Sequence, residues 1–261
     1  MKPDFIDIKP RLSRDGKITS SPRGWRLSIP SGPSKRYRLS QLDDHLGLAR
    51  QAYPWHPPLS LSLKARISSA DAPGTWGFGL WNDPFGFSFG PSEGFFHLPA
   101  LPNTIWFFHA SPKNYLSFRD DKPGYGFLAQ VFHSPRFTPA VIHAGMLLPF
   151  SAKRSRRLLS SVVSEDAVNL VVNVTDWHSY RLEWKAARST FWVDGNPVFE
   201  SPVSPASPLG LVIWVDNQYA AFMPDGRLKW GMEDNPESEW LEIEEVVVKS
   251  IDEDGEHKQN K

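Results

Sequence analysis

Apolar and polar residues alternate along much of this chain with the two-residue period of a β-strand. The clearest case is Leu59–Ile67, where every second side chain is apolar, so that one face of the strand is dry and the other wet. A weaker run at 25–29 lies between two turn clusters and indicates one or two outer strands in the first forty residues. Further strands are predicted at short aromatic-rich runs bounded by Gly, Pro, Asn or Asp, namely 75–81, 104–109, 114–118, 125–132, 177–184, 189–193, 198–200, 209–215 and 240–249.

One segment departs from this pattern. Between Pro139 and Val163, apolar side chains recur at the spacing of one helical face. Pro139 suits the first turn of a helix and Pro149 should end it, so we predict two short helices that form an insertion at 139–163. The cationic run 153–157 falls between them and is interpreted as a solvated turn, with phosphate or RNA binding as the less favoured alternative.

Composition and charge narrow the class of protein. The 24 Pro, 11 Trp and 17 Phe among 261 residues suit short strands joined by many turns. Lys plus Arg equals Asp plus Glu at 29 each, so we expect no nucleic-acid or membrane partner. There is no cysteine, and hence no disulfide or thiolate metal site. The N-terminus lacks the apolar run of a secretory signal, which makes a cytoplasmic location the expectation.

The segment 177–195 carries a recognisable sequence. It reads Trp-His-Ser-Tyr-Arg-Leu-Glu-Trp and then, at 190–195, Thr-Phe-Trp-Val-Asp-Gly. This resembles late strands of family-sixteen glycoside hydrolases and their concanavalin A-like relatives, and 74–81, 209–217 and 243–248 resemble other strands of that family in the same order. The resemblance implies an all-β jelly-roll β-sandwich of two antiparallel sheets, here with a small helical insertion. We expect one such domain over 1–261, with outer strands and loops at 1–40 and a charged tail at 252–261.

The same resemblance shows where the family's catalytic strand should lie. That strand reads Glu-x-Asp-x-x-Glu and is expected within 85–118, where the only glutamate is Glu93. Retaining hydrolysis needs two carboxyl groups about 5–5.5 Å apart. We therefore expect no retaining glycosidase chemistry of the family type.

The resemblance also implies that the strands beginning at 75, 104, 125 and 209 build a concave sheet whose side chains line a groove. Flat aromatic rings among amides and carboxylates suit sugar rings, although core packing is the competing interpretation for each tryptophan. Only about half of the candidates can face the groove, because side chains alternate between faces. The candidate ligand-binding residues are Trp76, Trp81, Asn82, Asp83, Trp106, Phe108, Tyr125, Gln130, Trp214, Asp216, Asn217 and Tyr219.

Two histidines and one glutamate are further candidates. His109 and His133 end successive aromatic runs and are expected near one rim of the groove, where a neutral imidazole could act as a general base. Histidines that only make structural hydrogen bonds are the alternative. Glu244 is the position that the resemblance assigns to a structural calcium ion, and no other cofactor is expected.

Two functions stay open at this stage. The first is a carbohydrate-interacting protein on a glucanase-like scaffold, with a glycan as its partner. The second is an enzyme of different chemistry that acts on a small, partly apolar substrate with His109 or His133 as acid–base. A third, weaker option is a glycosidase that uses Asp83 or Glu93 with an unrecognised partner. The position of the insertion would distinguish an open groove from a closed pocket, because an insertion on the groove side could cover the site.

Overall fold

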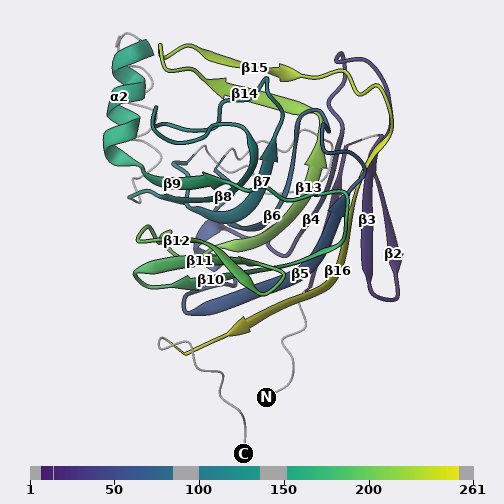
Figure 1. Ribbon diagram of the computed structural model, residues 1–261, viewed down its shortest axis with the longest axis horizontal. Helices are drawn as coiled ribbons and strands as arrows, with labels where there is room; N and C mark the ends of the chain where they lie inside the picture. The colour runs from purple at the N-terminus through teal and green to yellow at the C-terminus, as the bar shows by residue number, and fades with distance from the viewer. Residues whose placement is uncertain (1–6, 14, 85–99, 136–151, 253–261) are drawn as a thin grey trace, which may run out of the picture.

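The computed structural model describes residues 7–13, 15–84, 100–135 and 152–252. Their strands form two large antiparallel sheets that pack face to face, together with one small two-stranded sheet (Figure 1). Buried side chains from both large sheets join in one core between them. This architecture confirms the predicted jelly-roll β-sandwich.

Sheet A contains the strands that were expected to line a groove. Its order is β1-β4-β13-β6-β7-β8-β9, so the four strands beginning near 75, 104, 125 and 209 are neighbours. Its members are β1 (Lys9–Leu12), β4 (Leu39–Asp43), β6 (Thr75–Trp81), β7 (Thr104–Ala110), β8 (Gly126–His133), β9 (Ser164–Asn169) and β13 (Gly210–Asp216).

Sheet B contains the segment that carries the family resemblance. Its order is β12-β11-β10-β5-β16-β3-β2, and β5 matches the predicted strand 59–67. Its members are β2 (Lys17–Ser21), β3 (Gly24–Ile29), β5 (Leu59–Ile67), β10 (His178–Lys185), β11 (Arg188–Val193), β12 (Asn196–Ser201) and β16 (Glu239–Ser250).

Several predicted elements need correction. The first forty residues start four strands rather than one or two. The segment 114–118 is not a strand, and its only ladder contact is an isolated bridge between Tyr115 and Ala221. Three further strands escaped prediction, namely β9 and the hairpin of β14 (Gln218–Phe222) and β15 (Leu228–Met232). These strands form because they pair with neighbouring strands. Their own sequences are short and alternate only weakly, so the local pattern does not predict them.

Two helical elements complete the described part of the chain. They are η1 (Arg50–Ala52) and α2 (Ala152–Val162). The second predicted helix is confirmed by α2, whereas 139–151 lie outside the described residues. The cationic run 153–157 belongs to α2 and is not a turn between helices, since Lys and Arg are good helix formers and the run contains neither Gly nor Pro. Within the described ranges no helix is long and apolar enough to cross a membrane.

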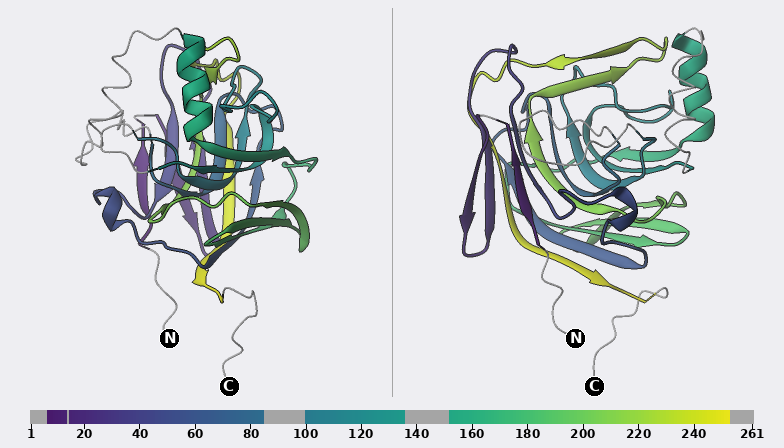
Figure 2. Two further views of the ribbon diagram at one scale, coloured as in Figure 1. Left: turned by 90° about the vertical axis from the view of Figure 1, so that its left-hand side faces the viewer. Right: turned by 180° about the vertical axis from the view of Figure 1, so that it is seen from behind.

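The helix and the β14–β15 hairpin lie on the side of sheet A that faces away from sheet B, here called the outer face (Figure 2). Val163, which follows α2, packs in an apolar cluster on this face. Phe118 bridges from Phe132 of β8 to Phe222 of β14, with ring centroids 5.8 and 5.5 Å away. The described part of the insertion is therefore beside the expected groove and not on the opposite surface of the sandwich.

Candidate functional site

Alternation along β6, β7 and β13 divides their aromatic side chains between the two faces of sheet A. Trp76, Phe78 and Phe107 enter the core between the sheets. The outer face carries a separate cluster, which we call the aromatic platform, and its members are Trp81, Trp106, Phe108 and Trp214.

The rings of the platform form one continuous group. Trp81 and Trp214 are nearly parallel, with centroids 6.3 Å apart and planes 6° apart. Trp106 and Phe108 stack with centroids 5.0 Å apart, and Trp214 lies 5.4 Å from Trp106 and 5.7 Å from Phe108. Adjacent positions on three neighbouring strands thus present a common apolar surface.

Two glycines of β6 make room for these rings. A Cβ atom at Gly77 would lie 2.8 Å from Cη2 of Trp214, and one at Gly79 would lie 2.5 Å from Cβ of Trp106. Both distances are shorter than van der Waals contact allows, so the tryptophans can cover β6 only because these two residues have no side chain.

Each indole N–H of the platform is held by a polar partner. Trp81 donates to Nε2 of His45 at 3.2 Å and Trp106 to Oε1 of Gln130 at 3.1 Å. Trp214 donates to Oγ1 of Thr75 at 2.9 Å. These bonds fix the orientation of the rings as well as satisfying buried donors.

Asp216 supports Trp214 through Thr75. The Thr75 hydroxyl donates to Oδ1 of Asp216 at 2.8 Å, and the Tyr37 hydroxyl donates to Oδ2 at 3.2 Å. Burial raises the pKa of Asp216 to about 7, against the opposing effect of these hydrogen bonds. Asp216 is therefore a positioning residue behind the platform.

A polar cluster adjoins the platform on β1 and β4. Gln41 is the cross-strand partner of Trp214, and its Nε2 donates to Oδ2 of Asp43 at 3.0 Å. Nε of Arg11 lies 3.4 Å from Asp43, and its Nη1 lies 3.8 Å from Asp83. Asp43 is fully buried, and its Oδ1 has no hydrogen-bond partner among the described residues.

The sequence analysis missed Arg11, Gln41 and Asp43, because β1 and β4 were assigned to loosely patterned outer segments. The available signal was the alternation of Leu39, Gln41 and Asp43 in 39–43, which places two polar side chains on the face that Leu39 shares with the platform.

Four other candidates do not join the platform. Asn82 braces a loop by donating to Leu101 O and accepting from Asn103 N. Asn217 is completely buried and accepts from Arg38 N. Tyr219 lies over Gly231 within the β14–β15 hairpin, and Tyr125 is half-exposed before β8.

The structure separates the remaining candidates from the outer face. Trp76 stacks on His109 inside the sandwich, with ring centroids 5.4 Å apart, and burial lowers the pKa of His109 to about 4. In the antiparallel register His109 pairs with Phe127 at the start of β8, so His133 lies at the other end of that strand. The expectation that both histidines meet at one rim is wrong. Nδ1 of His133 is 2.7 Å from Ser204 O.

The other carboxylates of the sequence analysis lie elsewhere. Glu244 is on sheet B, 3.7 Å from Nε of Arg23. Among the described residues, no group of three or more His, Asp or Glu side chains is arranged to hold a metal ion. Glu93 lies outside the described residues. The outer-face positions of β7 are occupied by Thr104, Trp106, Phe108 and Ala110, none of which carries a carboxyl group.

In comparisons with known proteins, the chain is similar to solved structures and to no family model or curated protein. A legume lectin-like domain from Entamoeba histolytica is similar at 11% identity over 94% of this chain and 90% of that one, with a TM-score of 0.49.

Two glucanases are similar to the same degree. They are the laminarinase catalytic domain from Thermotoga maritima, at 10% identity over 92% of this chain and 82% of that one with a TM-score of 0.49, and a β-glucanase from Bacillus licheniformis, at 12% over 92% and 84% with a TM-score of 0.47. These similarities concern the arrangement of the strands and say nothing of a ligand.

Proposed function

We propose that this protein binds a carbohydrate on the outer face of sheet A and has no retaining glycosidase activity there. The observation that carries the proposal is the aromatic platform, whose rings are oriented by hydrogen bonds and lie beside the polar cluster of Arg11, Gln41 and Asp43. A sugar ring has an apolar C–H face and a hydroxylated edge. The platform suits the first, and the amide, carboxylate and guanidinium groups suit the second.

The proposed lack of retaining chemistry rests on β7. The resemblance places the strand that carries the nucleophile and the acid within 85–118, and β7 is the described strand of that range. Its outer-face positions carry Thr104, Trp106, Phe108 and Ala110. A double displacement needs two carboxyl groups across the scissile bond. Trp106 and Phe108 give the outer face of β7 aromatic rings and no carboxyl group.

A titration of neutral oligosaccharides tests the proposal. β-Glucan, galactan and mannan oligomers would be added while indole fluorescence and heat are recorded. We expect one class to bind wild-type protein and to bind Trp214→Leu at least about fivefold more weakly, because loss of a stacking ring removes roughly 1–2 kcal/mol.

The matched control is Trp230→Leu. Trp230 is 69% exposed on β15, so this variant should bind like the wild type, and circular dichroism would show that both variants are folded. Failure of all three sugar classes to bind, or equal losses in the two variants, would refute the proposal.

Burial of the platform favours a second candidate function. Trp81, Trp106 and Trp214 are only 7–9% exposed, so little of each ring is accessible to a long glycan, and a small, partly apolar molecule is the better match. Monocyclic aromatic alcohols added in the same titration distinguish the candidates. If they bind in a Trp214-dependent manner and the oligosaccharides do not, the second function is correct.

A further inference from the structure

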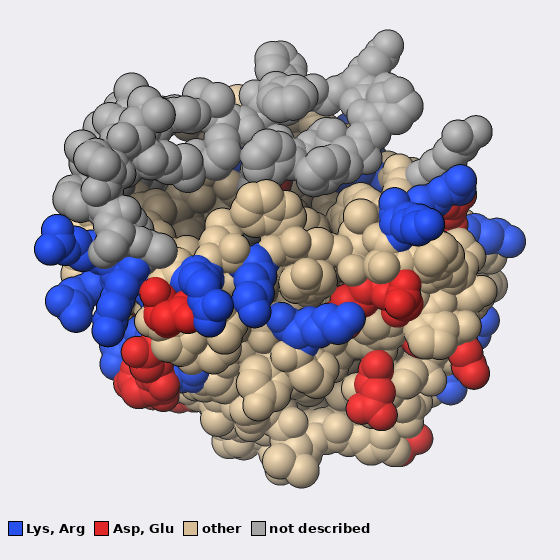
Figure 3. All heavy atoms as spheres, turned by 90° about the horizontal axis from the view of Figure 1, so that it is seen from above, with Lys and Arg blue, Asp and Glu red and all other residues tan. Residues whose placement is uncertain are grey.

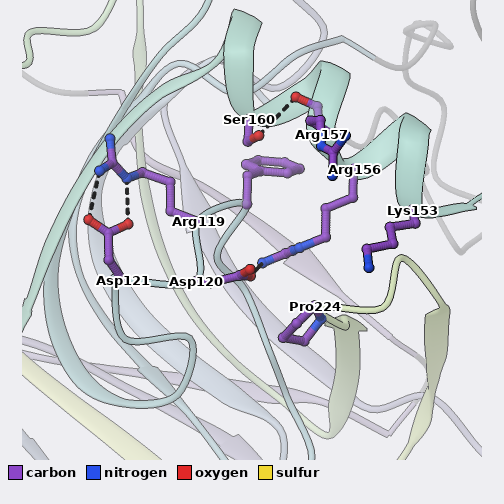
Figure 4. A pocket seen from close by; sticks show the side chains of 9 residues that line it. Arg119, Asp120, Asp121, Lys153, Arg156, Arg157, Ser160 and Pro224 are labelled. Atoms are coloured by element: carbon purple, nitrogen blue, oxygen red, sulfur yellow. Dashed lines mark hydrogen bonds and ion pairs between the residues drawn. The ribbon is translucent and has the colours of Figure 1, made fainter.

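A separate pocket of about 340 Å³ lies beside α2. Three segments that are distant in the sequence form it, as Figure 4 shows: one face of α2, the segment 118–121 and the turn between β14 and β15. It is lined by Phe118, Arg119, Asp120, Asp121, Lys153, Arg156, Arg157, Ser160 and Pro224.

The charges in this pocket do not balance. Both acidic side chains are already paired, since Asp121 accepts two bonds from Arg119 at 2.8 and 2.6 Å. Asp120 accepts from Arg156 at 2.8 Å. Lys153 and Arg157 make no ion pair within the described part of the chain. The four cationic and two acidic side chains of the described lining therefore leave an excess of two positive charges.

Arg156 gives the pocket a fixed frame. It is 4% exposed, and its Nη1 donates to Ser117 O at 2.8 Å and to Phe222 O at 2.5 Å. These bonds tie α2 to the residues that directly precede both other segments of the pocket. Arg157 follows Arg156 directly, and Lys153 lies about one helical turn before it. The bonds of Arg156 therefore also hold the backbone of these two residues in place.

The remaining lining is apolar or already bonded. Phe118 and Pro224 are the apolar members of the lining. The Ser160 hydroxyl donates to Arg157 O at 2.9 Å, so its hydrogen atom is already used in a bond within α2. The pocket thus combines positive charge with apolar contact, which suits an anionic group attached to a ring better than a free ion.

Neighbouring side chains link the pocket to the aromatic platform. Phe118 packs edge to face on Phe132 of the outer-face cluster. Gln130, which holds Trp106, donates to Leu116 O at 3.0 Å, two residues before Phe118. Viewed from above, Lys and Arg side chains gather at the end of the molecule that carries α2 (Figure 3).

We propose that Lys153 and Arg157 bind a carboxylate or sulfate substituent of an acidic glycan whose neighbouring sugar lies on the platform. The inference rests on the proposed function, and it narrows the ligand from carbohydrate in general to an acidic polymer. Phosphate offers the same oxyanion chemistry and serves as a separate arm of the test.

The experiment compares oligosaccharides of matched backbone: mannan with mannuronan, and neutral galactan with sulfated galactan. Wild-type protein should bind the acidic member of one pair at least about tenfold more tightly, because charge-assisted contacts are about twice as strong as neutral ones. The double variant Lys153→Gln/Arg157→Gln should lose this preference and keep the wild-type affinity for the neutral member. Added salt should weaken the acidic complex selectively.

Arg154→Gln is the matched control. Arg154 is an exposed cation of α2 that does not line the pocket, so its loss should change affinity less than about twofold if contact rather than net charge matters. Equal losses in Arg154→Gln and in the double variant would overturn the proposal, as would equal binding of acidic and neutral oligomers by wild-type protein.

The outcomes separate this proposal from the preceding one. Binding that needs Lys153 and Arg157 but is unaffected by Trp214→Leu supports the pocket and refutes the platform. Binding that needs Trp214 alone refutes the pocket. If inorganic sulfate or phosphate binds and every acidic oligomer fails to compete, the pocket is a free-anion site and its assignment to a glycan is wrong.

Discussion

The two faces of sheet A use the same kinds of aromatic residue in different ways. On the inner face, Trp76 is 1% exposed, stacks on Phe127 with centroids 5.1 Å apart, and its indole N–H has no hydrogen-bond partner among the described residues. On the outer face, every tryptophan N–H has a partner, as Trp214 has in Thr75. Packing alone holds the inner rings, whereas hydrogen bonds also set the orientation of the outer rings, which suits the proposed binding surface.

The largest expected effect comes from removing an inner ring. Trp76→Ala should lower the free energy of unfolding by about 3–5 kcal/mol, because it leaves a cavity in a densely packed core. Urea denaturation measures the loss. Trp76→Phe keeps an aromatic ring and should cost clearly less. Carbohydrate affinity per folded molecule should stay at the wild-type value, and a selective loss of binding would show that the two faces are not independent.

The buried titratable groups of the two faces should also contribute to stability with opposite dependence on pH. Burial lowers the pKa of His109 on the inner face to about 4, so its neutral form stabilises the fold above about pH 6.5 and this contribution is lost as the pH falls towards 4. Burial raises the pKa of Asp216 on the outer face to about 7. Its protonated form stabilises the fold at low pH, and this contribution is lost as the pH rises towards 7.

When one of these two groups is replaced, the pH dependence of the free energy of unfolding should reflect the group that remains. Between pH 4 and 6.5, His109→Gln should become less stable as the pH rises and Asp216→Asn more stable, each by at most about 1.4 kcal/mol per pH unit. Denaturation curves at half-unit steps would show the two slopes. Slopes of the same sign in both variants would contradict these opposite pKa shifts.

A smaller effect tests the hydrogen bond to Trp214. Thr75→Val should cost about 1–3 kcal/mol, because it leaves a buried indole N–H without its acceptor. Thr104→Val is the control on the same face, since the Thr104 hydroxyl is buried without a hydrogen-bond partner among the described residues, and this change should be neutral or stabilising. A comparable loss in both variants, measured by thermal denaturation, would show that side-chain shape and not the hydrogen bond matters at Thr75.

The smallest effect is expected at the exposed ring of the hairpin. Trp230→Ala should change stability by less than about 0.5 kcal/mol, because the side chain is 69% exposed. Its effect on carbohydrate affinity should be equally small. A loss of affinity as large as that of Trp214→Leu would extend the binding surface from sheet A to β15.

Local pattern was sufficient for some of these elements and not for others. The strand 59–67 alternates without exception, and its structure needs no information from elsewhere. By contrast, β9 reads Ser-Glu-Asp-Ala-Val-Asn and is a strand because it pairs with β8. For the site, Trp81, Trp106, Phe108, Gln130 and Trp214 were predicted and share one face, whereas Arg11, Gln41 and Asp43 became visible only when β1 and β4 joined sheet A.

The sequence by itself determined the all-β class, most strand positions and the absence of the acidic catalytic motif from 85–118, because these depend on residue type and spacing along the chain. Tertiary structure decided which side chains meet. The antiparallel register of β7 and β8 placed His109 beside the start of β8, whereas His133 lies at its end. The pairing of Gln41 with Trp214 joined a segment near the N-terminus to the platform. Tertiary structure also placed the cationic run along a pocket, because Arg156 binds the carbonyl oxygens of Ser117 and Phe222, which are 39 and 66 positions away in the sequence. Such contacts depend on how strands pair across long stretches of chain, which local periodicity does not specify.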